Sequence, residues 1–178
     1  MTLTINQLIL LIANFALTSF IGVVTGSNSL ITVPMMLEFK ITPACAIATN
    51  MFALIFMSIG GTIPFLKGDS LKRKDLPLLS ILTVIGSILG ALLVIIIPAQ
   101  TMPFLISIAM IVITIFSVIN SQKGVEKKEK PSAIAQKIGY LLTFLLGIYG
   151  GFFSGGYVTT LTASYVGFFN MTIIEAVA

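Results

Sequence analysis

Long apolar runs separated by short polar segments make up most of this chain. The longest runs extend over about 20 residues, the length that a helix needs to cross about 30 Å of hydrocarbon. They are uniformly apolar and lack the alternation of apolar and polar residues that marks the strands of a membrane β-barrel. We therefore predict helices over the apolar residues 6–26, 30–37, 44–66, 76–97, 104–119 and 138–178.

Small and polar residues break the first and the last of these runs. The apolar stretch 30–37 after the first break is too short to span a membrane alone. At its end, Thr42 and Pro43 favour a new helix start, with a threonine cap and a proline in the first turn. Gly60, Gly61 and Pro64 are expected to interrupt the next helix. The polar segments 67–75, 98–103 and 120–137 are predicted to be loops.

The composition makes lipid the main solvent of this chain. Hydrophobic residues account for 57% and charged residues for 9% of it, whereas a soluble domain carries about 25% charged residues. Since unsatisfied backbone groups are costly in hydrocarbon, we predict an all-α polytopic membrane protein. With one cysteine and no histidine, a Cys-cluster metal site and the commonest general base are excluded, and no cofactor is expected. The net charge of +4 does not indicate a nucleic-acid partner.

The basic residues predict the orientation in the cell membrane. Nine of the ten lie in two loops, which an intervening pair of helices places on the same side, while the hairpin 98–103 carries none. The positive-inside rule puts both charged loops in the cytoplasm. These nine residues are Lys67, Lys72, Arg73, Lys74, Lys123, Lys127, Lys128, Lys130 and Lys137.

An offset of 130 residues aligns the two broken regions without a gap, which predicts two tandem repeats with broken or re-entrant helices. Residues 1–120 then form the first repeat, 121–137 the charged loop and 138–178 the start of an incomplete second repeat. We expect about 60 to 80 further residues after Ala178 to complete it. The identical pairs are Gly26 with Gly156, Thr32 with Thr162, Phe39 with Phe169, Thr42 with Thr172, Ala46 with Ala176, and Ala48 with Ala178.

The direction of the repeats stays open at this stage. If residues 6–37 form one broken span, four crossings separate the repeats, which run parallel with the N-terminus inside. If the stretch 30–37 is re-entrant, the repeats are inverted.

The breaks are the candidate substrate site. Non-helical backbone at membrane depth is tolerated where it is buried or lines a cavity, and a restarting helix points free N–H groups and its positive dipole end at the gap. Such a break can bind an anion without a charged side chain. The alternative is a kink that only lets helices pack. The residues are Thr25, Gly26, Ser27, Asn28 and Ser29 in the first break and Ser154, Gly155 and Gly156 in the second.

Other polar and small residues in the apolar segments are candidates for a role in function or in helix packing. Thr49 and Asn50 follow the first break, and Asn50 either faces the substrate cavity or joins two helices. Glu175, an embedded carboxylate, is a candidate for proton coupling, although a carboxylate near a helix start at Thr172 is also stabilised by the dipole. Gly86 and Gly90, spaced as small-xxx-small, are interpreted as a helix-packing face.

These motifs resemble the TauE/SafE family of sulfite and organosulfur exporters. The resemblance rests on the glycine-containing break after residue 22, Pro34, the Ala-x-Ala-Thr-Asn segment 46–50, the Lys-Gly-Asp turn 67–69, the glycine pair 86 and 90, the hairpin proline 98, and the second break 147–156. The family break usually carries three consecutive glycines, whereas this chain has Gly-Ser-Asn-Ser at 26–29 and Gly-Tyr-Val-Thr at 156–159, with Ser164 in place of the second proline. The substrate is therefore not carried over as sulfite.

The resemblance and the breaks together favour a secondary transporter that exports a small anion, such as a sulfur-containing oxyanion or an organosulfonate. Its partners would be the lipid bilayer and this anion, and a homo-oligomer stays open. A non-transporting structural or assembly subunit is the alternative. An intramembrane enzyme is disfavoured because it would need a nucleophile and a base that the apolar segments do not offer beyond Glu175.

The predicted topology can be tested with single cysteines. Cysteines at Lys72 and Lys128 should react only with reagent on the cytoplasmic side, and one at Gln100 only with reagent outside, because the positive loops stay inside. Labelling of positions 72 and 100 from the same side would contradict the topology.

Overall fold

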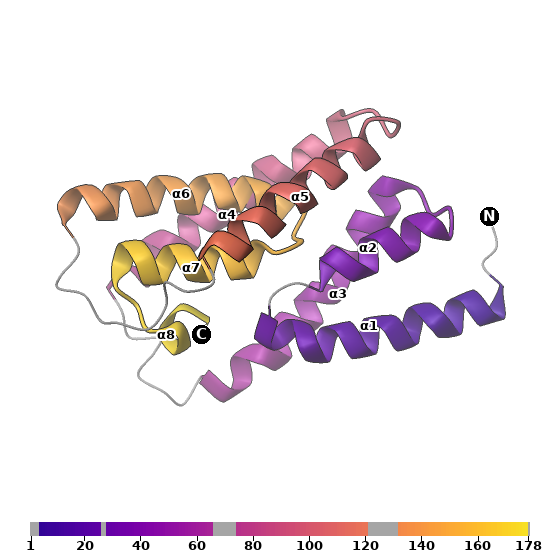
Figure 1. The fold of residues 1–178 in the computed structure, drawn as a ribbon, viewed down its shortest axis with the longest axis horizontal. Coiled ribbons are helices and arrows are strands. Elements are labelled where there is room, and N and C mark those ends of the chain that lie inside the picture. The colour runs from indigo at the N-terminus through magenta and orange to yellow at the C-terminus, as the bar shows by residue number, and fades with distance from the viewer. Residues whose placement is uncertain (1–3, 26–27, 66–73, 121–131, 178) are drawn as a thin grey trace.

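The computed structural model describes residues 4–25, 28–65, 74–120 and 132–177, and these residues form helices joined by short turns (Figure 1). No strand occurs among them. The predicted all-helical class is therefore confirmed. The elements are α1 Ile5–Thr25, α2 Ser29–Glu38, α3 Pro43–Thr62, the 3-10 helix η1 Ile63–Phe65, α4 Leu76–Ile96, α5 Met102–Asn120, α6 Ala133–Phe152, α7 Tyr157–Phe169 and α8 Ile173–Val177.

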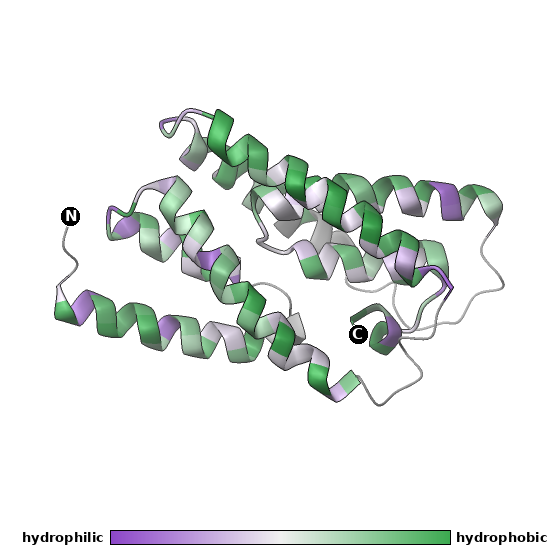
Figure 2. Ribbon diagram, turned by 180° about the vertical axis from the view of Figure 1, so that it is seen from behind, coloured by the Kyte–Doolittle hydropathy of each residue, from purple (hydrophilic) through white to green (hydrophobic). Residues whose placement is uncertain are grey.

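Four of these helices are long and apolar enough to cross a membrane: α1, α3 with η1, α4 and α6. Figure 2 shows how much of their length is hydrophobic. Large apolar side chains point away from the protein, with Phe20 85% and Ile95 81% exposed. Such a surface is stable only in a lipid solvent, so the chain is a multi-pass membrane protein.

Three local predictions were wrong. The loop predicted over 120–137 is shorter, because α5 includes Asn120 and α6 starts at Ala133, after Ser132. The Ser132 hydroxyl accepts a hydrogen bond from the Ala135 N–H at 3.2 Å and caps α6. Gly60 and Gly61 do not interrupt α3, since helical hydrogen bonding is favoured where water cannot replace it.

The third error concerns the start of α3. Thr42 occupies the predicted cap position, but its side chain makes no capping hydrogen bond. The Thr42 carbonyl instead accepts the Ala46 N–H at 2.9 Å. Pro43, which lacks an N–H, takes the first helical position as predicted.

The helices form two groups, α1 to α3 and α4 to α7 (Figure 1). In the first group, α2 runs back toward the end of the molecule where α1 begins. In the second, α7 runs back toward the opposite end, where α6 begins. The turns that follow α2 and α7 share a detail: Lys40 and Asn170, 130 positions apart, both adopt positive φ angles, 59° and 53°.

The closest helix packing lies between α4 and α6. A Cβ atom on Gly86 would lie 2.6 Å from the Phe144 carbonyl oxygen, and one on Gly151 would lie 2.6 Å from the Ser87 Cα. These glycines therefore let the two backbones touch. The Ser87 hydroxyl adds a 3.3 Å hydrogen bond to the Gly147 carbonyl. The interpretation of Gly86 and Gly90 as a packing face is confirmed.

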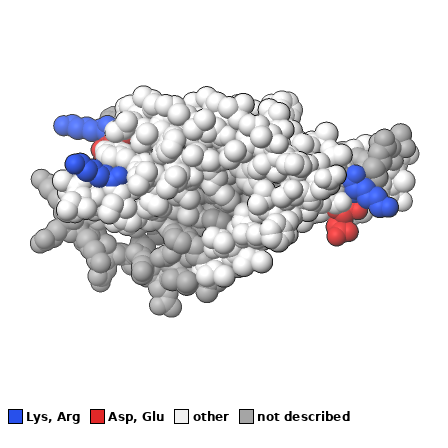
Figure 3. All heavy atoms as spheres, turned by 90° about the horizontal axis from the view of Figure 1, so that it is seen from above, with Lys and Arg blue, Asp and Glu red and all other residues white. Residues whose placement is uncertain are grey.

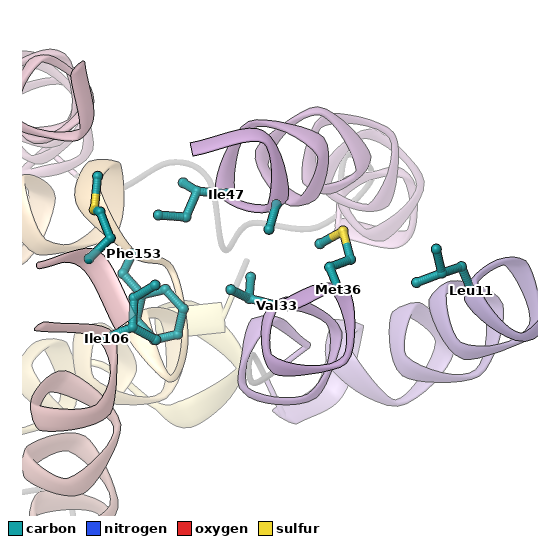
Figure 4. Packing of buried hydrophobic residues seen from close by; sticks show 8 residues of the cluster. Leu11, Val33, Met36, Ile47, Ile106 and Phe153 are labelled. Atoms are coloured by element: carbon teal, nitrogen blue, oxygen red, sulfur yellow. The ribbon is translucent and has the colours of Figure 1, made fainter. Parts of the chain in front are cut away.

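A buried apolar cluster joins the two groups of helices. Its fully buried Phe153 belongs to the segment between α6 and α7, so the core holds the second break in place. The members labelled in Figure 4 are Leu11 of α1, Val33 and Met36 of α2, Ile47 of α3, Ile106 of α5, and Phe153.

Figure 3 shows where the charged side chains of the described residues lie on one face of the molecule. On the face shown in Figure 3, those of the described residues lie at the two ends of the long axis, and the wide surface between them is uncharged. This distribution fits a protein whose middle lies in hydrocarbon and whose ends lie in water.

We expect Gly90→Ala to destabilise the protein by about 1–3 kcal/mol, because the added methyl group would lie 2.7 Å from the Phe152 backbone nitrogen. Gly60→Ala is the matched control, since its Cβ would meet no atom within 4 Å. The control should be neutral or slightly stabilising. Thermal unfolding in detergent measures both, and equal melting temperatures for the two variants would contradict the packing role.

Candidate functional site

The first break lies between α1 and α2. Gly26, Ser27 and the side chain of Thr25 lie outside the described residues, whereas Asn28 and Ser29 are almost fully buried. The Asn28 amide nitrogen donates to the Ser19 hydroxyl at 3.3 Å. Its amide oxygen is buried and has no hydrogen-bond partner among the residues that the structure describes. The first break therefore holds a polar group that the described protein satisfies only in part.

In the second break, Phe153 to Gly156, the carbonyls of Ser154, Gly155 and Gly156 all accept hydrogen bonds. Gly156 adopts a φ of 71°, in the left-handed region that glycine enters without strain. The Gly155 carbonyl accepts the Tyr149 hydroxyl at 2.6 Å, and the Gly156 carbonyl accepts both the N–H and the hydroxyl of Thr160, at 3.1 and 3.0 Å. The Ser154 carbonyl accepts the Tyr157 N–H at 3.1 Å.

The N–H groups of Gly155 and Gly156 differ from these carbonyls. Within the described ranges, neither donates a hydrogen bond to a protein acceptor. The positive end of the α7 dipole points at the same place. The break thus presents hydrogen-bond donors and positive potential, which suit an anion.

A buried polar cluster brings the two breaks together. The hydroxyls of Ser29 and Ser154 are hydrogen-bonded to each other across 125 positions of the sequence. The Asn50 amide nitrogen donates to both, at 2.7 Å to Ser29 and 3.3 Å to Ser154. The Thr32 hydroxyl donates to the Asn50 amide oxygen at 2.6 Å.

The cluster joins three of the predicted site residues, Ser29, Asn50 and Ser154, and adds Thr32, which the sequence interpretation did not include. Thr32 could have been found from its place in α2: it lies three positions after Ser29, and side chains at this spacing share one face of a helix.

A cavity of about 130 Å³ lies beside the breaks. It includes Gly22, four positions before Gly26, and Val158, two positions after Gly156. The Asn28 amide nitrogen lies 3.8 Å from the sulfur of Met57, a lining residue. None of the described lining residues is charged. The lining consists of Gly22, Met57, Ser58, Gly61, Thr62, Phe65, Val158 and Val177.

Two predicted residues, Thr49 and Glu175, belong neither to the breaks nor to the cluster. Thr49 is exposed on α3. Glu175 belongs to a capping box at the start of α8: its carboxylate accepts from the Thr172 N–H at 2.7 Å, while its own N–H donates to the Thr172 hydroxyl at 3.2 Å. Glu175 thus has a structural role at this helix start, the position that the sequence indicated. In the described part of the chain, no three His, Cys, Asp or Glu side chains come together as a metal site would require.

Comparison with known proteins adds the family. Residues 10–178 match the family model described as sulfite exporter TauE/SafE. A "Probable membrane transporter protein" of Haemophilus influenzae is 27% identical to the whole chain, which covers 69% of that relative. The "Probable membrane transporter protein YfcA" of Escherichia coli K12 is 27% identical over 91% of the chain and 60% of its own length. A "Probable membrane transporter protein ORF9" of a Sinorhizobium species is 24% identical over 89% of the chain and 60% of its own length. No solved structure matches the chain. The match to the family model over nearly the whole length shows that this chain belongs to the sulfite exporter TauE/SafE family.

Proposed function

We propose that this protein is a permease that moves a small anion across the cell membrane, and that the anion binds where the two helix breaks meet. The observation that carries this proposal is the asymmetry of the second break. The carbonyls of Ser154, Gly155 and Gly156 accept hydrogen bonds from the protein, whereas the N–H groups of Gly155 and Gly156 donate to no acceptor among the described residues.

This asymmetry favours an anion over a cation. At Ser154 to Gly156 a cation would need carbonyl oxygens that already accept hydrogen bonds, and it would face the positive end of the α7 dipole. An anion finds N–H donors in a region of low dielectric, where each hydrogen bond is stronger than in water. The described lining residues of the neighbouring cavity carry no charge, so electroneutral donors would supply the selectivity there.

The size of the cavity favours a ligand of a few heavy atoms. Pockets for drug-sized ligands measure about 300–1,000 Å³, and this cavity measures about 130 Å³. A sulfur-containing oxyanion or a short organosulfonate suits this size, and the family name points to the same chemistry. Export is the proposed direction. The family and the names of the relatives favour transport over enzyme activity.

We further infer that α2 and α7 are re-entrant and that the two repeats are inverted. In Figure 1, each of these helices turns back beside the helix that precedes it. Between the two broken regions the chain passes through α3, α4 and α5, and three crossings give the repeats opposite directions. The matching positive φ angles at Lys40 and Asn170 support the repeat itself. With the charged loops in the cytoplasm, the start of α1 lies outside.

The polar cluster supports alternating access in this arrangement. It connects the first break to the second through side-chain hydrogen bonds that can break and form again. The same cluster also suits the second candidate function, a non-transporting membrane subunit, because its side chains bond to one another without a ligand. Proton coupling through Glu175 stays a prediction, and it would require the capping bonds to Thr172 to open.

We expect Gly156→Asn to weaken binding of sulfite or methanesulfonate at least about tenfold, because it places a side chain where the backbone approaches the anion. Asparagine tolerates the left-handed backbone better than valine does, so the melting temperature should change little. Gly167→Asn, at a glycine with no neighbouring atom within 4 Å of its Cβ position, is the control. Isothermal titration calorimetry in detergent measures the affinity, and wild-type affinity in Gly156→Asn would rule out the break as the site.

A cross-link can separate the transporter from the non-transporting subunit. In a chain with Cys45→Ser, the pair Ser29→Cys and Ser154→Cys should form a disulfide on oxidation, because the two hydroxyls are in contact. The disulfide should stop anion flux into liposomes, and reduction should restore it. Flux that is unaffected by a complete cross-link would show that the breaks do not move apart during transport.

A further inference from the structure

Four side chains form a chain of hydrogen bonds that runs from Thr32 through Asn50 to Ser29 and Ser154. Thr32 determines which groups in this chain donate and which accept. Three of the four side chains are at most 1% exposed, and Ser154 is 9% exposed. Water therefore has little access to Thr32, Asn50 and Ser29, so the protein itself must supply partners for their buried donors and acceptors. Ser154 is the most exposed residue of the four.

Thr32 sets the orientation of the Asn50 amide. Its hydroxyl has one proton and two acceptors in reach, the Asn50 amide oxygen at 2.6 Å and the Asn28 carbonyl at 3.3 Å. The shorter contact is favoured. The Asn50 oxygen has no other donor in the part of the chain that the structure describes, so this bond turns the amide nitrogen toward the two serines.

The orientation of the amide leaves one proton unused on the serine pair. The amide nitrogen donates its two protons to Ser29 and Ser154. One hydroxyl proton then bridges the two serines. The other hydroxyl proton has no acceptor among the described residues. The pair can therefore donate one hydrogen bond to a ligand.

We propose that Thr32 is a positioning residue for anion selectivity: by holding the Asn50 amide, it makes the Ser29–Ser154 pair a hydrogen-bond donor to the anion. The inference rests on the proposed anion site and specifies how its side chains contribute. Thr32 does not touch the anion in this arrangement, since Asn50 lies between it and the serines.

Loss of the Thr32 hydroxyl would reverse the chain of hydrogen bonds. In Thr32→Val, the Asn50 oxygen would be buried without a donor, which is costly. Rotation of the amide by 180° would let that oxygen accept a serine proton instead. The serine pair would then have no proton left for the anion. Thr32→Ser keeps the hydroxyl and should keep the original direction.

The experiment measures sulfite affinity of the full chain in detergent by isothermal titration calorimetry, together with its melting temperature. We expect Thr32→Val to bind sulfite about tenfold or more weakly and Thr32→Ser to stay within about threefold of the wild type. Thr143→Val is the matched control, because Thr143 is also fully buried but donates to the Gly139 carbonyl in its own helix. Asn50→Asp, which replaces the donating amide with an acceptor, should abolish sulfite binding.

The outcomes separate the two proposals. Wild-type affinity in Thr32→Val, with affinity lost in Gly156→Asn, would overturn the role of Thr32 and leave the anion site in place. Equal losses in Thr32→Val and Thr32→Ser would also overturn it, since packing and not the hydroxyl would then be responsible. A wild-type chain that binds neither sulfite nor methanesulfonate would overturn the proposed function, and the role of Thr32 with it.

Discussion

Every backbone group inside a membrane must find its partner within the protein or in a bound ligand, and this constraint governs the rest of the structure. A continuous helix meets it automatically, whereas a break leaves N–H and C=O groups without partners. From Ser154 to Gly156, the described protein supplies partners to the three carbonyls but none to the N–H groups of Gly155 and Gly156. Tyr149, Tyr157 and Thr160 donate to the three carbonyls, so the chemistry that remains is that of a donor. The break favours an acceptor ligand because its bonded groups are carbonyls and its remaining groups are N–H donors.

The precision of this arrangement depends on α6. Gly147 and Gly151 place one face of α6 directly against the backbone of α4. On another face, a Cβ atom at Gly150 would lie 2.8 Å from the ring of Tyr157, the first residue of α7. Tyr149, between these glycines, holds the Gly155 carbonyl. Because α6 is fixed on both sides, the break at its end cannot shift without loss of packing in the core around Phe153.

Much of the fold could be predicted because the membrane simplifies the problem. Hydrophobic length alone identified the spanning helices, and the two breaks followed from Gly, Ser and Asn within apolar runs. The errors occurred where a single local hydrogen bond determines the end of a helix, as at the start of α6 after Ser132. The direction of α2 could not be read from its residues, since a re-entrant helix and half of a broken span have the same composition. Contacts such as that of Ser29 with Ser154 depend on the packing of segments that are distant in the sequence. The sequence pattern therefore identified these residues as candidates but could not predict which of them make contact.

The neutral character of the site bears on how a carrier could work. Within α1 to α5 and α7 there is no lysine or arginine. These helices therefore contain no buried cation that could pair with an anion. A buried unpaired cation is strongly destabilising when its partner leaves, and a carrier with one would resist changing conformation while empty. Here Thr32, Asn50 and the two serines are hydrogen-bonded to one another when no ligand is present. In the proposed carrier, the hydrogen bonds that close the empty site would also stabilise the empty state for its return, and the anion would compete only with bonds between neutral groups.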